Sequence, residues 1–332
     1  MPAPRSHSVL VAAARLYYLE GKSQGEVAKE LDVSRSSVSR ILAAARERGI
    51  VEIRIHPEGS LSRRDDLERE LVKRFGLADA VVVARPMGRN PVDVVAEMSA
   101  RIFENRLASL SSIGLSWGTT VARFVEHVLI EPIYPQLHID PLVGGMPTMD
   151  TGPAGNDSLE KLARKAGARM HRFESPAIVE SRVTWAALRG ESSIVRAISD
   201  AAGVQAALVG IGSFGVHASP KVVAAMQLTE QETAAFLSQD PVGDICGQFY
   251  DVRGTVLGAP TSERVIGASL EQLRNVPRVV GIAAGVEKAP GTVGALRTGV
   301  LASIVLEEGL AAAVLAGEGD RVLRRVSVPA SA

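Results

Sequence analysis

The segment SQGEVAKELDVSRSSVSRILAAARERG, residues 23–49, decides the fold of the N-terminal part of the chain. Ser23 is placed to cap a short helix over Gln24–Leu31, and Glu26 at the third helical position completes a capping box. Asp32 and Val33 then leave room only for a tight turn. This spacing predicts two helices joined by a minimal connection.

A further helix begins after Ser34, whose side chain is placed to cap it, and ends at Gly49. A longer helix over Val9–Glu20 precedes both and stops at Gly21. Three helices with a minimal turn before the third form a helix-turn-helix. The expected apolar positions are Val9, Ala12, Ala13, Leu16 and Leu19 in the first helix and Val38, Ile41, Leu42 and Ala45 in the third.

The third predicted helix has a polar face opposite its apolar stripe. At about 100° per residue, Ser36 and Arg40 point away from Val38. Hydroxyl groups can approach phosphates and base edges closely, and arginine can bind guanine with two hydrogen bonds. We expect Ser36, Ser37 and Arg40 to reach base edges and nearby residues to contact phosphates; a three-helix unit with a merely solvated polar face is the alternative. The predicted DNA-binding residues are Gln24, Ser34, Arg35, Ser36, Ser37, Ser39 and Arg40.

The residues after this module suggest a domain boundary. Residues 50–55 alternate apolar and polar side chains, which predicts a half-buried strand that serves as a wing or as the exit from the module. Pro57–Ser60 is rich in turn-forming residues, and a charged helix is predicted over Leu61–Phe75. We therefore divide the chain into a winged helix-turn-helix domain at 1–56, a linker and oligomerisation helix at 57–78, and a larger domain at 79–332.

Composition limits the class of protein. The 332 residues are 46% hydrophobic and 22% charged, which is enough apolar material for a substantial core. No run approaches the roughly 20 apolar residues that span a bilayer, and the N-terminus has no signal-peptide core. We expect a cytoplasmic protein with no membrane partner. The single cysteine, Cys246, excludes an internal disulfide, and no cofactor or metal site is predicted.

Charge is unevenly placed although the chain as a whole is neutral. Residues 1–56 hold nine Lys and Arg against six Asp and Glu, a net charge of +3, which the remainder balances with −3. A small basic head on a slightly acidic body suits a DNA-binding module fused to a domain that does not bind DNA. A structural chromatin protein would be strongly basic throughout, so the neutral chain argues against that class.

Beyond residue 75, short apolar runs alternate with helical stretches. This alternation predicts an α/β fold with a largely parallel, Rossmann-like sheet covered by helices. The expected strands are Ala80–Ala84, Ser112–Leu115, His138–Val143, Ala206–Ile211 and Val279–Ala283, and the expected helices include Val92–Leu107, Thr119–Val128 and Ser158–Ala166.

The loops that directly follow these strands are the places where a parallel sheet binds ligands. Residues 114–120 combine glycines, hydroxyl groups and the start of a helix, which suits a phosphate or a carboxylate. Asp244 offers a carboxylate to ligand hydroxyls, and Lys288 offers a counter-charge. Turn glycines, capping hydroxyls and solvated charges are the ordinary alternatives. The predicted ligand-binding residues are Gly114, Ser116, Gly118, Thr119, Thr120, Gly144, Gly145, Asn156, Asp244, Lys288 and Glu307.

The segment YYLEGKSQGEVAKELDVSRSSVSRILAAARERGIVEIRI, residues 17–55, resembles the DNA-binding head of the sorbitol-operon regulator family, which is often grouped with deoxyribonucleoside regulators. The resemblance implies a dimer or tetramer that binds operator DNA and responds to a phosphorylated sugar, in a domain similar to sugar-phosphate isomerases and deaminases. The sequence departs from the family pattern at Val286, where a third glycine is expected, and at Leu306. The resemblance continues in order through GLSWGTT at 114–120, PLVGGM at 141–146, ALVGIGS at 207–213, GDICGQFYDVRG at 243–254, AAGVEK at 283–288 and VLEEGLAA at 305–312.

Two function classes use such a domain. A sugar-phosphate isomerase or deaminase needs a carboxylate base, a lysine and an anion loop, and Glu307 or Asp244, Lys288 and residues 114–120 offer these groups. Such an enzyme has no use for a helix-turn-helix. We therefore expect a transcriptional regulator of a sugar, polyol or nucleoside-sugar catabolic operon, without catalytic residues, and keep the enzyme as the alternative.

Overall fold

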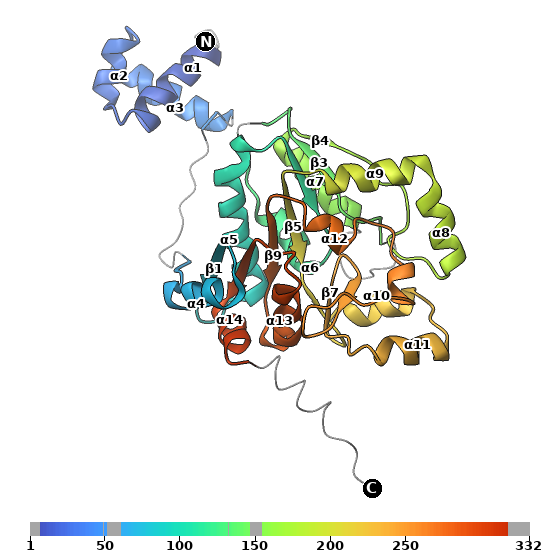
Figure 1. Ribbon diagram of the computed structural model, residues 1–332. Coiled ribbons are helices and arrows are strands. Elements are labelled where there is room, and N and C mark those ends of the chain that lie inside the picture. Colours follow the sequence, from blue (N-terminus) through green and yellow to red (C-terminus); the bar gives the residue numbers. More distant parts are fainter. Residues whose placement is uncertain (1–6, 49, 52–60, 132, 147–154, 318–332) are drawn as a thin grey trace. The chain divides into compact units, whose positions relative to one another are not determined.

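The computed structural model describes residues 7–48, 50–51, 61–131, 133–146 and 155–317 (Figure 1). The contacts divide the chain into two compact units, Met1–Ser60 and Leu61–Ala332. The predicted strand over residues 50–55 lies mostly outside the described residues.

The N-terminal unit contains the predicted helix-turn-helix. Its elements are α1 (His7–Ala14), the π-helical turn η1 (Arg15–Leu19), α2 (Gln24–Glu30) and α3 (Arg35–Glu47). Ser23 and Glu26 form the predicted capping box, and the Ser34 side chain caps α3. Asp32 turns the chain with a left-handed φ of 49°. The predicted stripe on α3 is confirmed, since Val38, Ile41, Leu42 and Ala45 are all buried.

The apolar face predicted for the first helix is partly wrong. Ala13 and Leu16 are buried as predicted, but Leu10 and Ala14 are buried as well and Leu19 is 78% exposed. The exposure of Leu19 is due to the π-helical turn, in which the Glu20 amide donates to the Arg15 carbonyl five residues earlier. Each turn of this kind holds more residues than an α-helical turn, so it rotates the following side chains away from the expected face.

The C-terminal unit is built on a parallel sheet, which confirms the predicted α/β fold. Within the described residues, seven strands lie in the order β1-β10-β9-β5-β2-β3-β4, and every neighbouring pair is parallel. The strands are β1 (Asp79–Val83), β2 (Ser112–Leu115), β3 (His138–Pro141), β4 (Arg169–Met170), β5 (Ala206–Gly210), β9 (Val279–Ala283) and β10 (Ser303–Glu307). A small antiparallel sheet in the order β6-β7-β8 comprises β6 (Gly212–Ser213), β7 (Gly243–Ile245) and β8 (Gln248–Tyr250).

Helices cover both faces of the parallel sheet (Figure 1). Alternate strand residues point to opposite faces, so Val81 and Val83 pack into one core while Ala80 and Val82 pack into the other. One core includes α5 (Pro91–Arg106), α6 (Thr119–His127) and α7 (Gly155–Ala166). The other includes α4 (Asp65–Phe75), α13 (Ala289–Arg297), α14 (Glu308–Leu315) and the small sheet.

The remaining elements connect or flank these layers. They are η2 (Leu107–Ser109), α8 (Arg182–Gly190), α9 (Ser192–Ala202), α10 (Ser219–Ala225), α11 (Glu230–Leu237), η3 (Thr261–Glu263), α12 (Leu270–Leu273) and η4 (Val286–Lys288). Among the residues that the structure describes, no helix has the length and apolar character needed to cross a membrane.

The helix predicted from Leu61 begins only at Asp65. The preceding residues are extended and bond to the edge strand β1: the Arg64 amide donates to the Val82 carbonyl at 2.9 Å, and Arg63 faces Val83 in an antiparallel bridge. Glu68 on α4 fixes this arrangement, because its carboxylate accepts from the Val82 amide and from both arms of the Arg63 guanidinium. Bonding to an otherwise unpaired strand edge therefore replaces the first helical turn.

Candidate functional site

A cavity of about 330 Å³ opens where β2, β5 and β9 end. The chain passes from β2 to β3 on one side and from β5 to β9 on the other, so the order of the sheet reverses between β2 and β5. Parallel α/β sheets bind ligands at such a reversal, and the volume suits a small metabolite. The wall includes residues 117–120 after β2, residues 210–213 after β5, and Gly285, Glu287 and Lys288 after β9.

One end of the cavity is formed by the start of α6. Gly118 precedes this helix with a φ of 132°, a conformation that favours glycine, and no side chain among the described residues caps the helix there. Thr120 is buried in the wall and Thr119 is exposed. Backbone amides at a helix start, together with hydroxyl groups, bind anions well. This end of the cavity is therefore suited to a phosphate or a carboxylate.

Another part of the wall carries opposite charges. Asp244 is 5% exposed and accepts a hydrogen bond of 3.1 Å from the Gly247 amide. Burial raises the pKa of the Asp244 carboxyl to about 6. Burial also lowers the pKa of the Lys288 ammonium, which donates to the Ile211 carbonyl at 3.2 Å; the negative charges of Asp244 and Glu287 oppose that shift. These groups can bind hydroxyls as donor and acceptor.

Some wall residues were not predicted. Glu287 accepts a hydrogen bond from His217 at 2.6 Å. Burial is the largest single influence on the Glu287 carboxyl and raises its pKa, but this hydrogen bond, a backbone hydrogen bond and the charges of His217 and Lys288 together lower the pKa. Trp117 and Asn90 also line the cavity. A sequence signal existed for Glu287, which adjoins Lys288, and for Trp117, which lies in the predicted loop. None existed for His217, because only the fold brings it near residue 287.

Of the predicted ligand-binding residues, the structure brings Gly118, Thr119, Thr120, Asp244 and Lys288 together at the cavity. The others lie outside its wall. Gly114 packs against Leu142, where a side chain would clash. Ser116 accepts a 3.0 Å hydrogen bond from the Gly210 amide and so joins the ends of β2 and β5.

The remaining predicted residues have other surroundings. Gly144 lies against the Ser175 carbonyl, too close for any side chain. Gly145 faces Asn156, which lines a separate and more open hollow. Glu307 is buried and caps α14 by accepting from the amides of Gly309 at 2.5 Å and Leu310 at 2.8 Å. Its carboxylate serves the helix and does not line the cavity.

In the N-terminal unit, the predicted DNA-binding residues lie at the start of α3 and α2. Arg35, Ser36, Ser39 and Arg40 are exposed, and Gln24 is half-buried at the start of α2. The Ser34 hydroxyl bonds to Ser36 at 3.0 Å and to Ser37 at 2.9 Å, which orients these side chains. Ser37 is half-buried, and its amide donates to the Ser34 cap.

Histidines far apart in the sequence also meet. His171 Nδ1 lies 2.6 Å from Asp140 Oδ1, and His171 Nε2 lies 3.2 Å from His138 Nδ1. Burial raises the pKa of the Asp140 carboxyl, although the hydrogen bond from His171 opposes the shift. In the part of the chain that the structure describes, no group of three or more His, Cys, Asp or Glu is arranged to hold a metal ion.

Comparison with known proteins identifies both units. Residues 60–316 match the family described as "Putative sugar-binding domain", and residues 4–48 match that described as "Sigma-70, region 4". The sorbitol operon regulator of Klebsiella pneumoniae is 28% identical over 291 residues, 87% of this chain and 91% of the relative. The deoxyribonucleoside regulator of Bacillus subtilis (strain 168) is 27% identical over 300 residues, 89% of this chain and 93% of the relative.

A solved structure agrees with these relatives. The crystal structure of the full-length sorbitol operon regulator SorC from Klebsiella pneumoniae superimposes with a TM-score of 0.69 at 27% identity, covering 93% of this chain and 100% of that one. The alignment includes the helix-turn-helix, which a sugar-phosphate isomerase does not need. From the matched domains, the relatives and the fold, the chain belongs to the SorC/DeoR-type family of transcriptional regulators with a sugar-binding domain.

Proposed function

We propose that the protein represses or activates a carbohydrate catabolic operon in response to a phosphorylated sugar bound in the cavity at the ends of β2, β5 and β9. The observation that carries the proposal is the start of α6, where Gly118, Thr119 and Thr120 combine uncapped amides with hydroxyl groups at the reversal of the sheet. The phosphate binds there. Asp244 and Lys288 bind hydroxyls of the same sugar.

In this proposal the N-terminal unit binds operator DNA, and effector binding in the larger domain controls that binding. We assign DNA binding to residues 1–56 and effector binding to residues 79–332, with residues 57–78 joining them. The exposed Arg35, Ser36, Ser39 and Arg40 contact the DNA, together with Gln24, Ser34 and Ser37. Hydroxyl groups and arginines at the start of the second helix of a helix-turn-helix are typical of major-groove contacts.

The proposal includes a homo-oligomer, a dimer or a tetramer, that works in the cytoplasm. A single helix-turn-helix buries less surface than tight specific binding requires. Two N-terminal units, bound to adjacent half-sites one helical turn apart, would together bury the surface that tight specific binding requires. The effector changes the spacing of the heads or the state of assembly, which couples the two binding events.

The proposal is tested by thermal unfolding of the full chain with a panel of sugars, polyols and their phosphates. A ligand that prefers the folded state raises the melting temperature by mass action. We expect rises with phosphorylated compounds and much smaller ones with their unphosphorylated counterparts. Rises confined to unphosphorylated polyols would refute the phosphate site.

A pair of threonine variants tests whether the phosphate binds at the start of α6. Thr120→Val removes a hydroxyl from the cavity wall at nearly constant volume, and we expect it to abolish most of the rise. Thr292→Val is the control, because Thr292 is equally buried in α13 but does not line the cavity. Equal losses in the two variants would argue against an anion site at the start of α6.

A further inference from the structure

The cavity has less positive charge than a ligand with two phosphates needs. The charged or titratable side chains in its described wall are Asp244, Cys246, Glu287, Lys288 and His217, and no arginine is among these wall residues. Burial raises the pKa of the Cys246 thiol, which therefore adds no charge at neutral pH. With His217 neutral the wall sums to −1, and with His217 protonated it sums to zero. A phosphate monoester carries close to two negative charges at neutral pH. A second phosphate would therefore meet Lys288 as the one lysine or arginine in the described wall.

Glu287 places a negatively charged carboxylate in the wall of the cavity. Its carboxylate turns back over Gly285, close enough to occupy the place of a side chain there. His217 Nε2 lies 2.6 Å from Glu287 Oε1, so the carboxylate is held in this position. The pair joins the segment after β6 to η4, and its side chains are 59% and 43% exposed for His217 and Glu287.

The anion-binding features follow a different strand. In the sheet β5 lies between β9 and β2, so η4 after β9 and the start of α6 after β2 line the cavity from opposite sides of β5. The start of α6 carries Gly118, Thr119 and Thr120 and has no charged side chain within these three residues. The cavity is therefore polarised: one part attracts an anion through amides and hydroxyls, and the segment after β9 presents a carboxylate beside a lysine. A ligand with a phosphate at one end and hydroxyls at the other matches both parts.

We propose that Glu287, held by His217, is a specificity residue that admits sugars with one phosphate and rejects those with a second phosphate at the opposite end. The inference rests on the proposed function, since it assigns a charge class to the ligand of the same cavity. Like charges brought together at a binding surface are strongly unfavourable. Replacing Glu287 with an uncharged isostere should therefore weaken the rejection.

The experiment measures dissociation constants by calorimetry for matched sugar monophosphates and bisphosphates. Suitable pairs are fructose 6-phosphate with fructose 1,6-bisphosphate and glucose 6-phosphate with glucose 1,6-bisphosphate, together with pentose pairs. We expect the full chain to bind monophosphates at least about ten-fold more tightly than the matching bisphosphates. Glu287→Gln should tighten the bisphosphates and reduce that ratio about five-fold or more.

Two further variants separate charge from shape. Glu126→Gln is the matched control, because Glu126 is also 43% exposed and ion-paired, with Lys161, but does not line the cavity. It should leave the ratio unchanged. His217→Ala removes the hydrogen bond to Glu287 while keeping the negative charge of Glu287, and it should not reduce the ratio.

Three results would overturn the inference: equal or tighter binding of bisphosphates by the unmodified chain, an unchanged ratio in Glu287→Gln, or an equal reduction in His217→Ala. The last result would mean that the pair acts as a steric barrier. Failure of the proposed function itself looks different, because then neither monophosphates nor bisphosphates bind and the inference fails with it.

Discussion

Asp244 is a buried carboxylate whose protonation affects folding. Its side chain accepts a hydrogen bond from the Gly247 amide, and Lys288 lies near enough to favour the charged form. Burial outweighs both and raises the pKa to about 6, from an ordinary value of 3.8. The folded chain therefore keeps this proton over a pH range in which the unfolded chain has lost it.

This difference gives a pH dependence with a definite sign. Between about pH 4 and pH 6 the folded state binds more protons than the unfolded state, so the free energy of unfolding falls as the pH rises. A shift of this size corresponds to about 3 kcal/mol. Asp244→Asn keeps the acceptor and removes the titration, so denaturant unfolding at a series of pH values should show the variant gaining relative stability from pH 4 to 6.5. Parallel curves for the two proteins would contradict the assignment.

Arg40 is the residue on which we expect operator affinity to depend most visibly. It is exposed on α3 with its Nε 3.4 Å from the Ser36 carbonyl. A bidentate arginine contact is worth about 1–3 kcal/mol of discrimination, so Arg40→Ala should weaken operator binding ten-fold or more in a mobility-shift titration.

Arg15→Ala is the control for this prediction. Arg15 is exposed in the same unit but lies in η1, outside the proposed recognition helix. We expect a smaller loss from it, caused by the change in overall charge alone. If Arg40→Ala bound the operator as well as the unmodified protein, α3 would not read the bases through this side chain.

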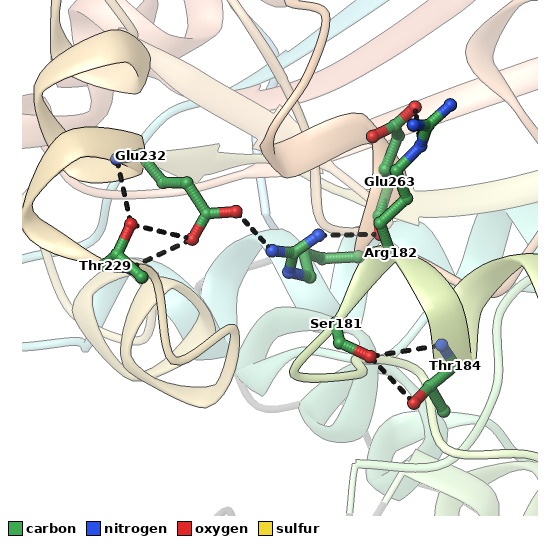
Figure 2. A network of polar contacts seen from close by, with 7 residues as sticks. Ser181, Arg182, Thr184, Thr229, Glu232 and Glu263 are labelled. Carbon is green, nitrogen blue, oxygen red and sulfur yellow. Dashed lines mark hydrogen bonds and ion pairs between the residues drawn. The ribbon is translucent and has the colours of Figure 1, made fainter.

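At the scale of elements, a polar network joins α8, α11 and the segment around η3 (Figure 2). Arg264 is only 6% exposed and pairs with Glu232 at 2.5 Å, while Arg182 is 74% exposed and pairs with Glu263 at 3.0 Å. Thr229 orients Glu232 through a capping box, and Ser181 caps α8 by accepting from the Thr184 amide.

The two ion pairs should contribute unequally to stability. Arg264→Ala removes a buried side chain together with its charge-assisted bonds, and we expect the free energy of unfolding to fall by about 2 kcal/mol. Arg182→Ala breaks an exposed pair and should cost less than about 1 kcal/mol. Urea denaturation of both variants tests this order, and the reverse order would show that the exposed pair is the more important one.

The helices and strands were largely predictable because their signals are local. Cap residues such as Ser23 and Ser34 and the stripe on α3 lie within a few residues of the structure they specify. The first helix shows the limit, since its π-helical turn leaves no periodicity that could be distinguished from an ordinary helix. The extended segment before α4 shows another, because the partner of Arg64 is strand β1, which comes later in the chain.

The candidate site was predictable only in part. The position after a strand brought Gly118 and Lys288 to the cavity, but the end of a strand also brought Glu307 to a helix cap and Ser116 to a bond with the neighbouring strand. Spacing along the chain cannot show which way a side chain turns. The choice between a cavity wall and a backbone partner is made by tertiary contacts.

At the scale of the whole molecule, the chain has two units with separate cores. Ligands that bind different units should therefore stabilise different unfolding transitions. An effector present at about 100 times its Kd adds about 2.7 kcal/mol to the unit that binds it. We expect calorimetric scans of the full chain to show the effector raising the transition of residues 61–332, and operator DNA raising that of the N-terminal unit.

The coupling between the two ligands is then measurable in the same scans. If the effector acts on DNA binding, adding it should change the shift that DNA produces in the N-terminal transition. A shift that is identical with and without effector would show that the two sites are independent, and the regulatory part of the proposal would fail.

The indole ring of Trp117 in the wall of the cavity also allows ligand binding to be followed by the fluorescence of the protein itself. The chain has two tryptophans, Trp117 and Trp185. Trp117 lines the cavity with its Nε1 buried and without a hydrogen-bond partner among the described residues, whereas Trp185 lies in a separate small core and donates to the Val265 carbonyl at 3.0 Å. A ligand that enters the cavity changes the surroundings of one ring and leaves the other as it was. Intrinsic fluorescence of a Trp185→Phe protein therefore follows the occupancy of the site directly, without a label and without DNA.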